Sequence, residues 1–308
     1  MFEKLFAQSG LSLDRLRAYA EIVVAGGITA ASGDDSNRQS QLSRQLKELE
    51  RYFGVELIKR GRGPMSLTEA GQRLYQIIGH SFGALDEFHQ ACTHQPVELV
   101  IGAGESLIQW LLLPRLSPLT TAHPKLNVTL QNLRTDEVLK RLADGSVDFG
   151  VISRLDKNRA LASVPLGQID YALFLPPGML SSKRSFKFPS QVLDRLPLAV
   201  LNGSSEIRQA LEEEAQKRKI KLEIRLRFSS FPQLAQAVQT VKVAAIMPTL
   251  AAGSLTPGNF QMIRLPFLDG HSRRLSLVWN KPLAEVRPAL ATYSTVLANA
   301  FRQAAAKP

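Results

Sequence analysis

Three stretches in the first ninety residues carry apolar side chains at helical spacing. The first covers residues 13–24; Ser12 stands where a hydroxyl can cap the first turn, and Gly26-Gly27 follows the last turn. The second covers residues 38–53, and the third follows Thr68. The pattern therefore predicts three helices, with a short helix over 29–32 and a polar turn over 33–37 between the first two.

The second predicted helix has two unlike faces. Its apolar face contains Leu42, Leu46, Leu49 and Phe53, and its opposite face contains Ser40, Arg44, Lys47 and Arg51. Arginine and lysine can neutralise phosphates, and glutamine or arginine can bond base edges in pairs. The polar face therefore suits the major groove of DNA, although a solvated surface helix shows the same pattern.

A short hairpin is predicted next. Residues 55–60 and 65–67 have strand character, and the glycine-rich segment 61–64 joins them. Lys59, Arg60 and Arg62 stand near this tip, where cations add affinity for phosphates without reading sequence. We interpret the hairpin as the wing of a helix-turn-helix domain.

The third helix, capped by Thr68, carries a narrow apolar seam. Its members recur at spacings of four and three residues and are Leu74, Ile78, Ser81, Leu85, Phe88 and Cys92. Two residues per heptad suit pairing with another helix, which favours a dimer. The alternative is packing within the same chain.

From Pro96 onward, strands alternate with helices. The first unit has strands over 97–102, 126–131 and 147–152 with helices over 107–119 and 136–143. The second has strands over 198–201, 222–228 and 243–247 with helices over 205–219 and 232–239, and an apolar stretch, 171–175, lies between the units. A strand over 274–279 and a helix over 285–302 close the chain. This order predicts two largely parallel, doubly wound lobes.

Composition adds little to this picture. The net charge is +11, which suggests an anionic partner, but residues 1–92 carry 11 basic and 11 acidic side chains, so the whole excess lies after them. The chain shows neither a signal-peptide core nor a window of ~18 uncharged apolar residues, so we expect a cytoplasmic protein without a membrane partner. Cys92 is the single cysteine and is expected to be buried.

The sequence lacks the common catalytic and cofactor-binding motifs. The five histidines form no HExxH pair, no GxSxG elbow is present, and neither a dinucleotide fingerprint nor a GxxxxGK[ST] loop occurs. We therefore expect neither an enzyme nor a bound cofactor or metal.

The sequence resembles the LysR-type transcriptional regulators. The residues that carry the resemblance are Leu16-Arg17-Ala18-Tyr19, the run 39–50, Phe53-Gly54-Val55-Glu56-Leu57, Leu67-Thr68-Glu69-Ala70-Gly71, and, more loosely, 112–116 and 142–148. The resemblance implies that the helix bearing Gln39, Ser43 and Arg44 enters the major groove, that the wing around Arg60 and Arg62 touches the DNA backbone, and that the following helix dimerises. It also implies a clamshell effector domain like that of periplasmic binding proteins.

The sequence departs from the family pattern in three places. Gln39-Ser40-Gln41 replaces a usual Gln-Pro-Ala, and Asp35 and Asn37 stand where a buried Leu and Val are usual. An aspartate cannot fill an apolar pocket, so Asp35 is expected to face solvent in a rebuilt turn. The segment 241–248 lacks two usual glycines, which alters the expected pocket.

Candidate effector residues follow from the strand ends of the predicted lobes. Ligands of such sheets bind beyond the carboxyl ends of strands, beside helix N-termini. This selects Ser106, Thr135, Asn202, Ser204, Ser205 and Arg208. Short hydroxyls beside free amides suit a carboxylate or another anion, and Arg208 can clamp it. The alternative is that these residues are ordinary helix caps and surface residues.

The sequence thus predicts an α/β protein with three parts: a winged helix-turn-helix domain over 1–67, a linker and dimerisation helix over 68–95, and a two-lobed effector domain over 96–308. We expect a DNA-binding transcription regulator modulated by a small molecule, acting as a homodimer or homotetramer on double-stranded DNA. The alternative is a cytoplasmic small-molecule sensor that acts through protein partners. The expected DNA-binding residues are Thr29, Arg38, Gln39, Ser40, Gln41, Ser43, Arg44, Lys47, Arg60 and Arg62.

Overall fold

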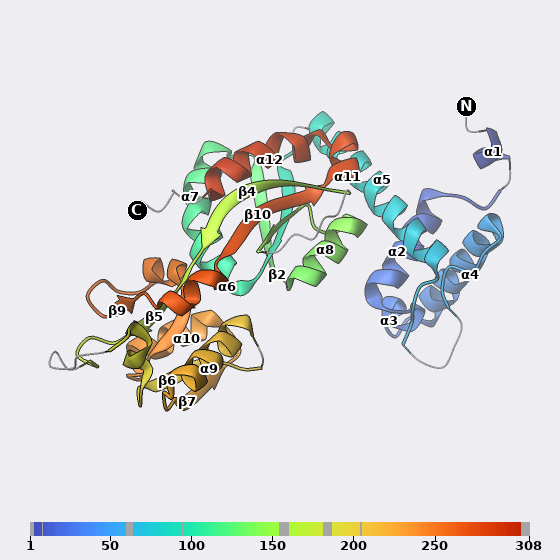
Figure 1. Cartoon of the computed structure of the whole chain (residues 1–308). Helices are drawn as coiled ribbons and strands as arrows, with labels where there is room; N and C mark the ends of the chain where they lie inside the picture. The colour runs from blue at the N-terminus through green and yellow to red at the C-terminus, as the bar shows by residue number, and fades with distance from the viewer. Residues whose placement is uncertain are drawn as a thin grey trace.

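The computed structural model describes residues 3–7, 9–59, 64–93, 95–153, 160–180, 187–203 and 205–302. It has an N-terminal helical domain, a long helix α5 (Glu69–Thr93), and a domain of two α/β lobes. Figure 1 shows the first lobe between the N-terminal domain and the second lobe. The predicted fold class is confirmed.

The N-terminal domain is a small helical bundle. Its described helices are α1 (Glu3–Phe6), α2 (Leu13–Ala25), α3 (Ile28–Ser32) and α4 (Ser36–Phe53). Ser12 caps α2 as predicted, because its hydroxyl accepts from the Arg15 amide, and Gly26 ends the helix in the left-handed region with φ +79°. Tyr19, Ile22 and Leu49 are fully buried in the core between α2, α4 and the start of α5.

Helix α4 begins two residues before the predicted Arg38. The Asp35 carboxylate accepts from the amides of Asn37 and Arg38, at 2.9 and 3.1 Å, and so caps the helix. Asp35 faces solvent, as expected, because a capping carboxylate at a helix N-terminus stays hydrated while it satisfies free amides.

Two residues assigned to apolar core faces are exposed instead. Leu13 keeps 62% of its surface and Phe53 keeps 38%, because they stand in the first turn of α2 and the last turn of α4, beyond the bundle's core. Within the described residues the predicted hairpin shows one antiparallel bridge, between Ile58 and Leu67. Of its predicted tip, 61–64, only Pro64 is among the described residues.

The predicted seam of α5 divides into two halves. Leu74 and Ile78 pack into the core of the N-terminal domain. The other members, Ser81, Leu85, Phe88 and Cys92, are exposed. The expectation that Cys92 is buried is therefore wrong for this single chain, because Cys92 lies in the last turn of α5 on the face turned away from the lobes.

Lobe I is a five-stranded sheet with helices on both faces. The strand order is β2 (Leu126–Asn132), β1 (Val97–Ala103), β3 (Phe149–Ile152), β10 (Arg273–Asn280) and β4 (Leu161–Ile169). The helical elements are α6 (Glu105–Leu107), the π-helix η1 (Ile108–Leu112), α7 (Leu113–Ala122), α8 (Thr135–Asp144), α11 (Lys281–Val286) and α12 (Pro288–Phe301). Separate apolar clusters fill the two faces, one under α7 and α12 and the other under α8.

Lobe II is built on two smaller sheets joined by a parallel bridge between Leu198 and Ala244. Its strands are β5 (Tyr171–Leu175), β6 (Pro197–Leu201), β7 (Glu223–Phe228), β8 (Ala245–Pro248) and β9 (Gln261–Ile263). Its helices are α9 (Glu206–Arg218) and α10 (Phe231–Thr240), with 3-10 turns η2 (Pro189–Leu193), η3 (Thr249–Ser254) and η4 (Pro266–His271).

The prediction of largely parallel sheets is wrong in part. Among the described strands, β2-β1-β3 and β6-β7 pair in parallel, whereas β10 is antiparallel to β3 and β4, and β5 is antiparallel to β8 and β9. The reason lies in the two crossings between lobes. Strand β4 leaves lobe I at Ile169 and β10 returns beside it at Arg273, so the two crossing strands must run in opposite directions.

The predicted closing helix is broken at Arg287-Pro288. Arg287 is extended, with φ −121° and ψ 91°, because the proline ring disfavours the helical region for the residue before it. The chain therefore forms α11 and α12 instead of one helix, and this break lies beside α5.

Candidate functional site

The outward side of α4 matches the predicted DNA-binding face. Gln39, Ser40, Arg44 and Lys47 are exposed, and the buried leucines of α4 face the opposite way. Among the described residues, no carboxylate lies within 4.0 Å of Arg44 or Lys47, which leaves both charges available to an anion.

A groove of about 660 Å³ runs along one flank of this face. It is bordered by α3, α4 and the two ends of the hairpin, and it brings together Thr29, Ser43, Lys47 and Lys59. Thr29 Oγ1 also accepts from Gln39 Nε2, at 3.4 Å. Thr29, Ser43 and Lys47 are predicted DNA-binding residues, whereas Lys59 was assigned only to the wing.

The other flank of α4 is more acidic. Arg38 and Gln41 line a hollow toward α2 that also contains Asp14, Glu21 and Asp35. Arg38 Nη2 lies 3.2 Å from Glu21 Oε2, so its charge is already paired. The two flanks therefore differ in sign, and the basic flank is the better match for a phosphate backbone. Arg60 and Arg62 lie outside the described residues.

A cleft of about 300 Å³ opens between the lobes. Lobe I contributes Ser106 and Thr135, both predicted, together with Arg134 and Ser153. Lobe II and the crossing strands contribute Tyr171, Phe231, Pro248 and Arg273. Among the described residues, two arginines and no carboxylate line the cleft, and the N-terminus of α8 opens beside it at Thr135. This arrangement favours an anion.

Arg273 joins the two lobes at the cleft. It begins β10, and its Nη2 lies 3.1 Å from the carboxylate of Glu206, the first residue of α9. Tyr171 stands close to both charges. Burial raises the pKa of Tyr171, Arg273 lowers it by a smaller amount, and Glu206 raises it again. The phenol is therefore neutral near pH 7 and able to donate a hydrogen bond.

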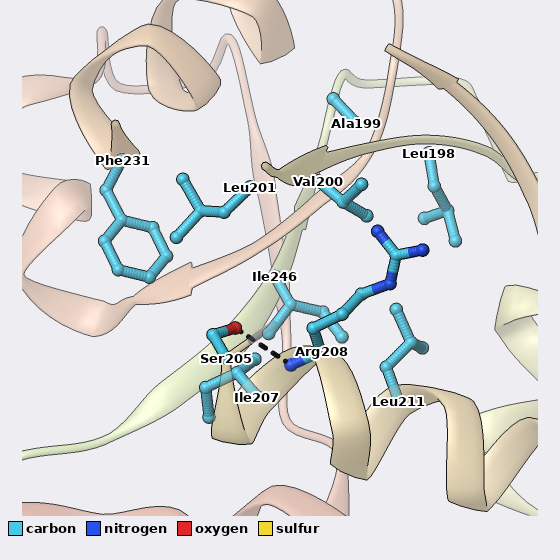
Figure 2. A pocket seen from close by; sticks show the side chains of 10 residues that line it. All are labelled: Leu198, Ala199, Val200, Leu201, Ser205, Ile207, Arg208, Leu211, Phe231 and Ile246. Carbon is cyan, nitrogen blue, oxygen red and sulfur yellow. Dashed lines mark hydrogen bonds between the residues drawn. The ribbon is translucent and has the colours of Figure 1, made fainter. Parts of the chain in front are cut away.

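The remaining predicted effector residues lie elsewhere. Figure 2 shows Ser205 and Arg208 lining a separate cavity of about 20 Å³ inside lobe II, where the Ser205 hydroxyl accepts from the Arg208 amide at 3.2 Å. The Arg208 guanidinium pairs with Glu212 on the same helix. Asn202 is exposed and lines neither cavity, and Ser204 lies outside the described residues.

Sequence reasoning missed Arg134, Tyr171, Phe231 and Arg273. Arg134 is the N-cap residue of α8, beside the predicted Thr135, so the helix N-terminus that the sequence reasoning selected could have pointed to it. Phe231 begins α10, whose N-terminus the sequence reasoning did not select. Tyr171 and Arg273 carried no such signal, because the pairing of β4 with β10 that brings them to the cleft was not predicted.

The described part of the chain shows neither a metal-binding cluster nor a membrane-spanning helix. It holds no group of three or more histidine, cysteine, aspartate or glutamate side chains placed to bind a metal ion. It also contains no helix with the length and apolar character needed to cross a bilayer.

Known proteins match this architecture along nearly the whole chain. Residues 13–72 match the family model "Bacterial regulatory helix-turn-helix protein, lysR family", and residues 95–301 match "LysR substrate binding domain". A probable hydrogen peroxide-inducible genes activator of Mycobacterium leprae is 31% identical over 231 residues, which is 73% of each chain.

Solved structures show the same fold at low sequence identity. Full-length OxyR from Pseudomonas aeruginosa aligns over 98% of this chain and 100% of that one, with a TM-score of 0.66 at 18% identity. Full-length CbnR in complex with its target DNA aligns over 92% of this chain and 100% of the CbnR chain, with a TM-score of 0.54 at 18% identity. With both domains matched in order, the chain belongs to the LysR family of DNA-binding transcriptional regulators, whose activity is modulated by effectors.

Proposed function

We propose that this regulator binds DNA through the outward side of α4 and the basic groove beside it. The observation that carries the proposal is that Arg44 and Lys47, neither of which pairs with a described carboxylate, stand on an exposed helix face whose flank also holds Thr29, Ser43 and Lys59. We assign Arg44 to base edges and Lys47 and Lys59 to the phosphate backbone, in keeping with the chemistry of their side chains. The structure of CbnR with its target DNA supports the same use of the fold.

The test is the double variant Arg44→Ala/Lys47→Ala, with Arg225→Ala/Lys217→Ala on exposed positions of lobe II as the matched control for net charge. The probe is a site selected by the wild-type protein from random DNA. We expect the first variant to lose affinity and to lower the slope of log affinity against log salt by about 1 per bound protomer, because only Lys47 of the two is assigned to a phosphate, while the control keeps both properties. Equal losses in the two variants would contradict the proposal.

We further propose that the cleft between the lobes binds a small anion and that binding shifts the balance between lobe arrangements. Donors come from Arg134, Arg273, Ser106 and the neutral Tyr171 hydroxyl, and none of the described residues that line the cleft is a carboxylate. A panel of small carboxylates, with the matching carboxamides as neutral controls, tests this in a thermal-shift assay. A ligand at 100 times its Kd adds about 2.7 kcal/mol. Stabilisation by a carboxamide equal to that by its carboxylate would refute an anion site.

We propose that the active form is a homodimer or a higher homo-oligomer joined along α5. Leu85 and Phe88 are 53% and 70% exposed on the face turned away from lobe I, where a second α5 would cover them. A regulator of this kind has to share the compartment of its DNA, so a cytoplasmic location belongs to the proposal. We assign the chain no catalytic role.

The alternative is a small-molecule sensor that acts through a protein partner, with the N-terminal domain as the contact. Gene regulation in cells that survives Arg44→Ala/Lys47→Ala would favour that alternative, because a partner surface elsewhere on the domain would remain intact.

A further inference from the structure

Helix α5 is packed closely against lobe I along one face. A Cβ added at Gly79 would lie 2.2 Å from the backbone oxygen of Asp144 at the end of α8, and one added at Gly83 would lie 3.4 Å from Arg287 Cδ. Gly79, Gly83 and Glu87 are four residues apart and share this face. Figure 1 shows α5 running from the N-terminal domain toward α11 and the α8 side of lobe I.

Glu87 and Arg287 form the polar centre of this contact. Arg287 Nε lies 3.1 Å from Glu87 Oε2, and its Nη1 lies 2.5 Å from Asp148 Oδ1. The other Glu87 oxygen accepts from the Ala289 amide at the start of α12, at 2.6 Å. The three side chains keep only 11%, 14% and 6% of their surface.

The buried charges of this cluster require one particular arrangement of α5 on lobe I. Two carboxylates share one guanidinium out of water, and the Asp148 carboxylate also accepts from the Val100 amide. Loss of one member leaves a buried charge without its partner, which is far more costly than loss of an exposed pair. The extended backbone at Arg287, imposed by Pro288, places both the guanidinium and the Ala289 amide beside α5.

A second contact lies two turns earlier on α5. His80 Nε2 lies 3.3 Å from Asn280 Nδ2. Asn280 is itself fixed within lobe I, because it also donates to the Leu142 carbonyl and accepts from the Leu283 amide. Two separate polar contacts therefore hold α5 in both position and rotation on lobe I.

At its other end, α5 belongs to the N-terminal domain. Ile78 is buried in that domain's core, and Gly71 in the first turns lies against Leu57 and Tyr19. We propose that Glu87 and Arg287 are positioning residues for DNA binding: they make the N-terminal domain, α5 and lobe I of one protomer a single body. This inference rests on the proposed DNA-binding function.

The experiment compares Arg287→Met and Glu87→Gln with Arg225→Met, which removes an exposed arginine of lobe II that pairs with Glu223. The probes are the DNA site selected by the wild-type protein and one half of that site. We expect Arg287→Met to weaken binding to the full site at least tenfold and to leave binding to the half-site unchanged. An N-terminal domain that is no longer fixed to lobe I still binds one half-site, but the two domains of a dimer no longer match the spacing of the two half-sites. Amide exchange in 84–93 should also accelerate at least tenfold.

A second variant, Gly79→Leu, separates α5 from lobe I by bulk without altering charge, and it should show the same loss for the full site only. Thermal melting of each variant identifies a misfolded protein. A folded Arg287→Met with an unchanged ratio of full-site to half-site affinity would overturn the inference. Failure of the wild-type protein to prefer any DNA would instead overturn the proposed function, so the two failures are distinguishable.

Discussion

Ser272 donates a hydrogen bond to Asp170 across the two chain crossings that join the lobes, with 2.6 Å between Oγ and Oδ1. Asp170 lies between β4 and β5, and Ser272 directly precedes β10. Gln168 donates to the same carboxylate oxygen at 2.9 Å, and the backbone oxygen of Asp170 accepts from Thr249. The carboxylate therefore ties the outgoing and returning strands together at the hinge of the clamshell.

Ser272→Ala should lower the melting temperature at pH 7. The hydrogen bonds from Ser272 and then Gln168 lower the pKa of Asp170 below its ordinary 3.8. Because the folded pKa is depressed, the ionised carboxylate contributes stability above about pH 4, and that contribution disappears as pH falls through the lowered value. The difference in melting temperature between the variant and the wild type should therefore shrink toward pH 3.

The control for this prediction is Ser163→Ala, an exposed serine on β4. It should change the melting temperature little at either pH. A deficit for Ser272→Ala that is as large at pH 3 as at pH 7 would show that the hydroxyl acts through packing rather than through the Asp170 charge.

Features set by neighbours in the sequence could be predicted, and features set by distant pairing could not. Ser12 as the cap of α2 and the bounds of α9 followed from local spacing. The antiparallel return of β10 beside β4, which carries Arg273 into the cleft, had no local signal. Ser205 and Arg208 were grouped with Ser106 because all three follow predicted strands, yet the structure places Ser106 in a different cavity from the other two.

Gly71→Ala should destabilise the N-terminal domain. A Cβ at this position would lie 2.0 Å from the Leu57 oxygen and 2.7 Å from the Tyr19 hydroxyl, so the hairpin or α2 must move. Overpacking of this kind costs about 1–3 kcal/mol. Thermal unfolding should show an earlier transition, with reduced DNA binding. At Gly253 an added Cβ meets no atom within 4 Å, so Gly253→Ala should leave both properties unchanged.

Asp35→Ala should loosen the start of α4 without disturbing its C-terminal half. The carboxylate caps the amides of Asn37 and Arg38, and loss of such a cap costs about 0.5–2 kcal/mol. Amide exchange should accelerate in 36–40 and stay slow at Leu46 and Leu49, which are buried. The matched control is Asp34→Ala, which removes a neighbouring exposed charge outside the capping position. Equal acceleration in both variants would assign the effect to charge alone.

Arg273→Gln should weaken binding of the carboxylate that best stabilises the protein, whereas Glu206→Gln should strengthen it. Arg273 lines the cleft, but its guanidinium is held by Glu206, so a bound anion competes with that carboxylate. Because the pair is partly exposed, replacing Glu206 by a bound carboxylate as the partner of Arg273 costs little free energy. A charge-assisted hydrogen bond is worth about 1.5–3 kcal/mol, so calorimetry should show roughly a tenfold or greater loss of affinity for Arg273→Gln.

Glu212→Gln makes the same charge change two turns along α9 and should have a smaller effect, because Glu212 pairs with Arg208 instead. Equal gains in Glu206→Gln and Glu212→Gln would mean that only the overall field matters and that Glu206 does not compete for Arg273.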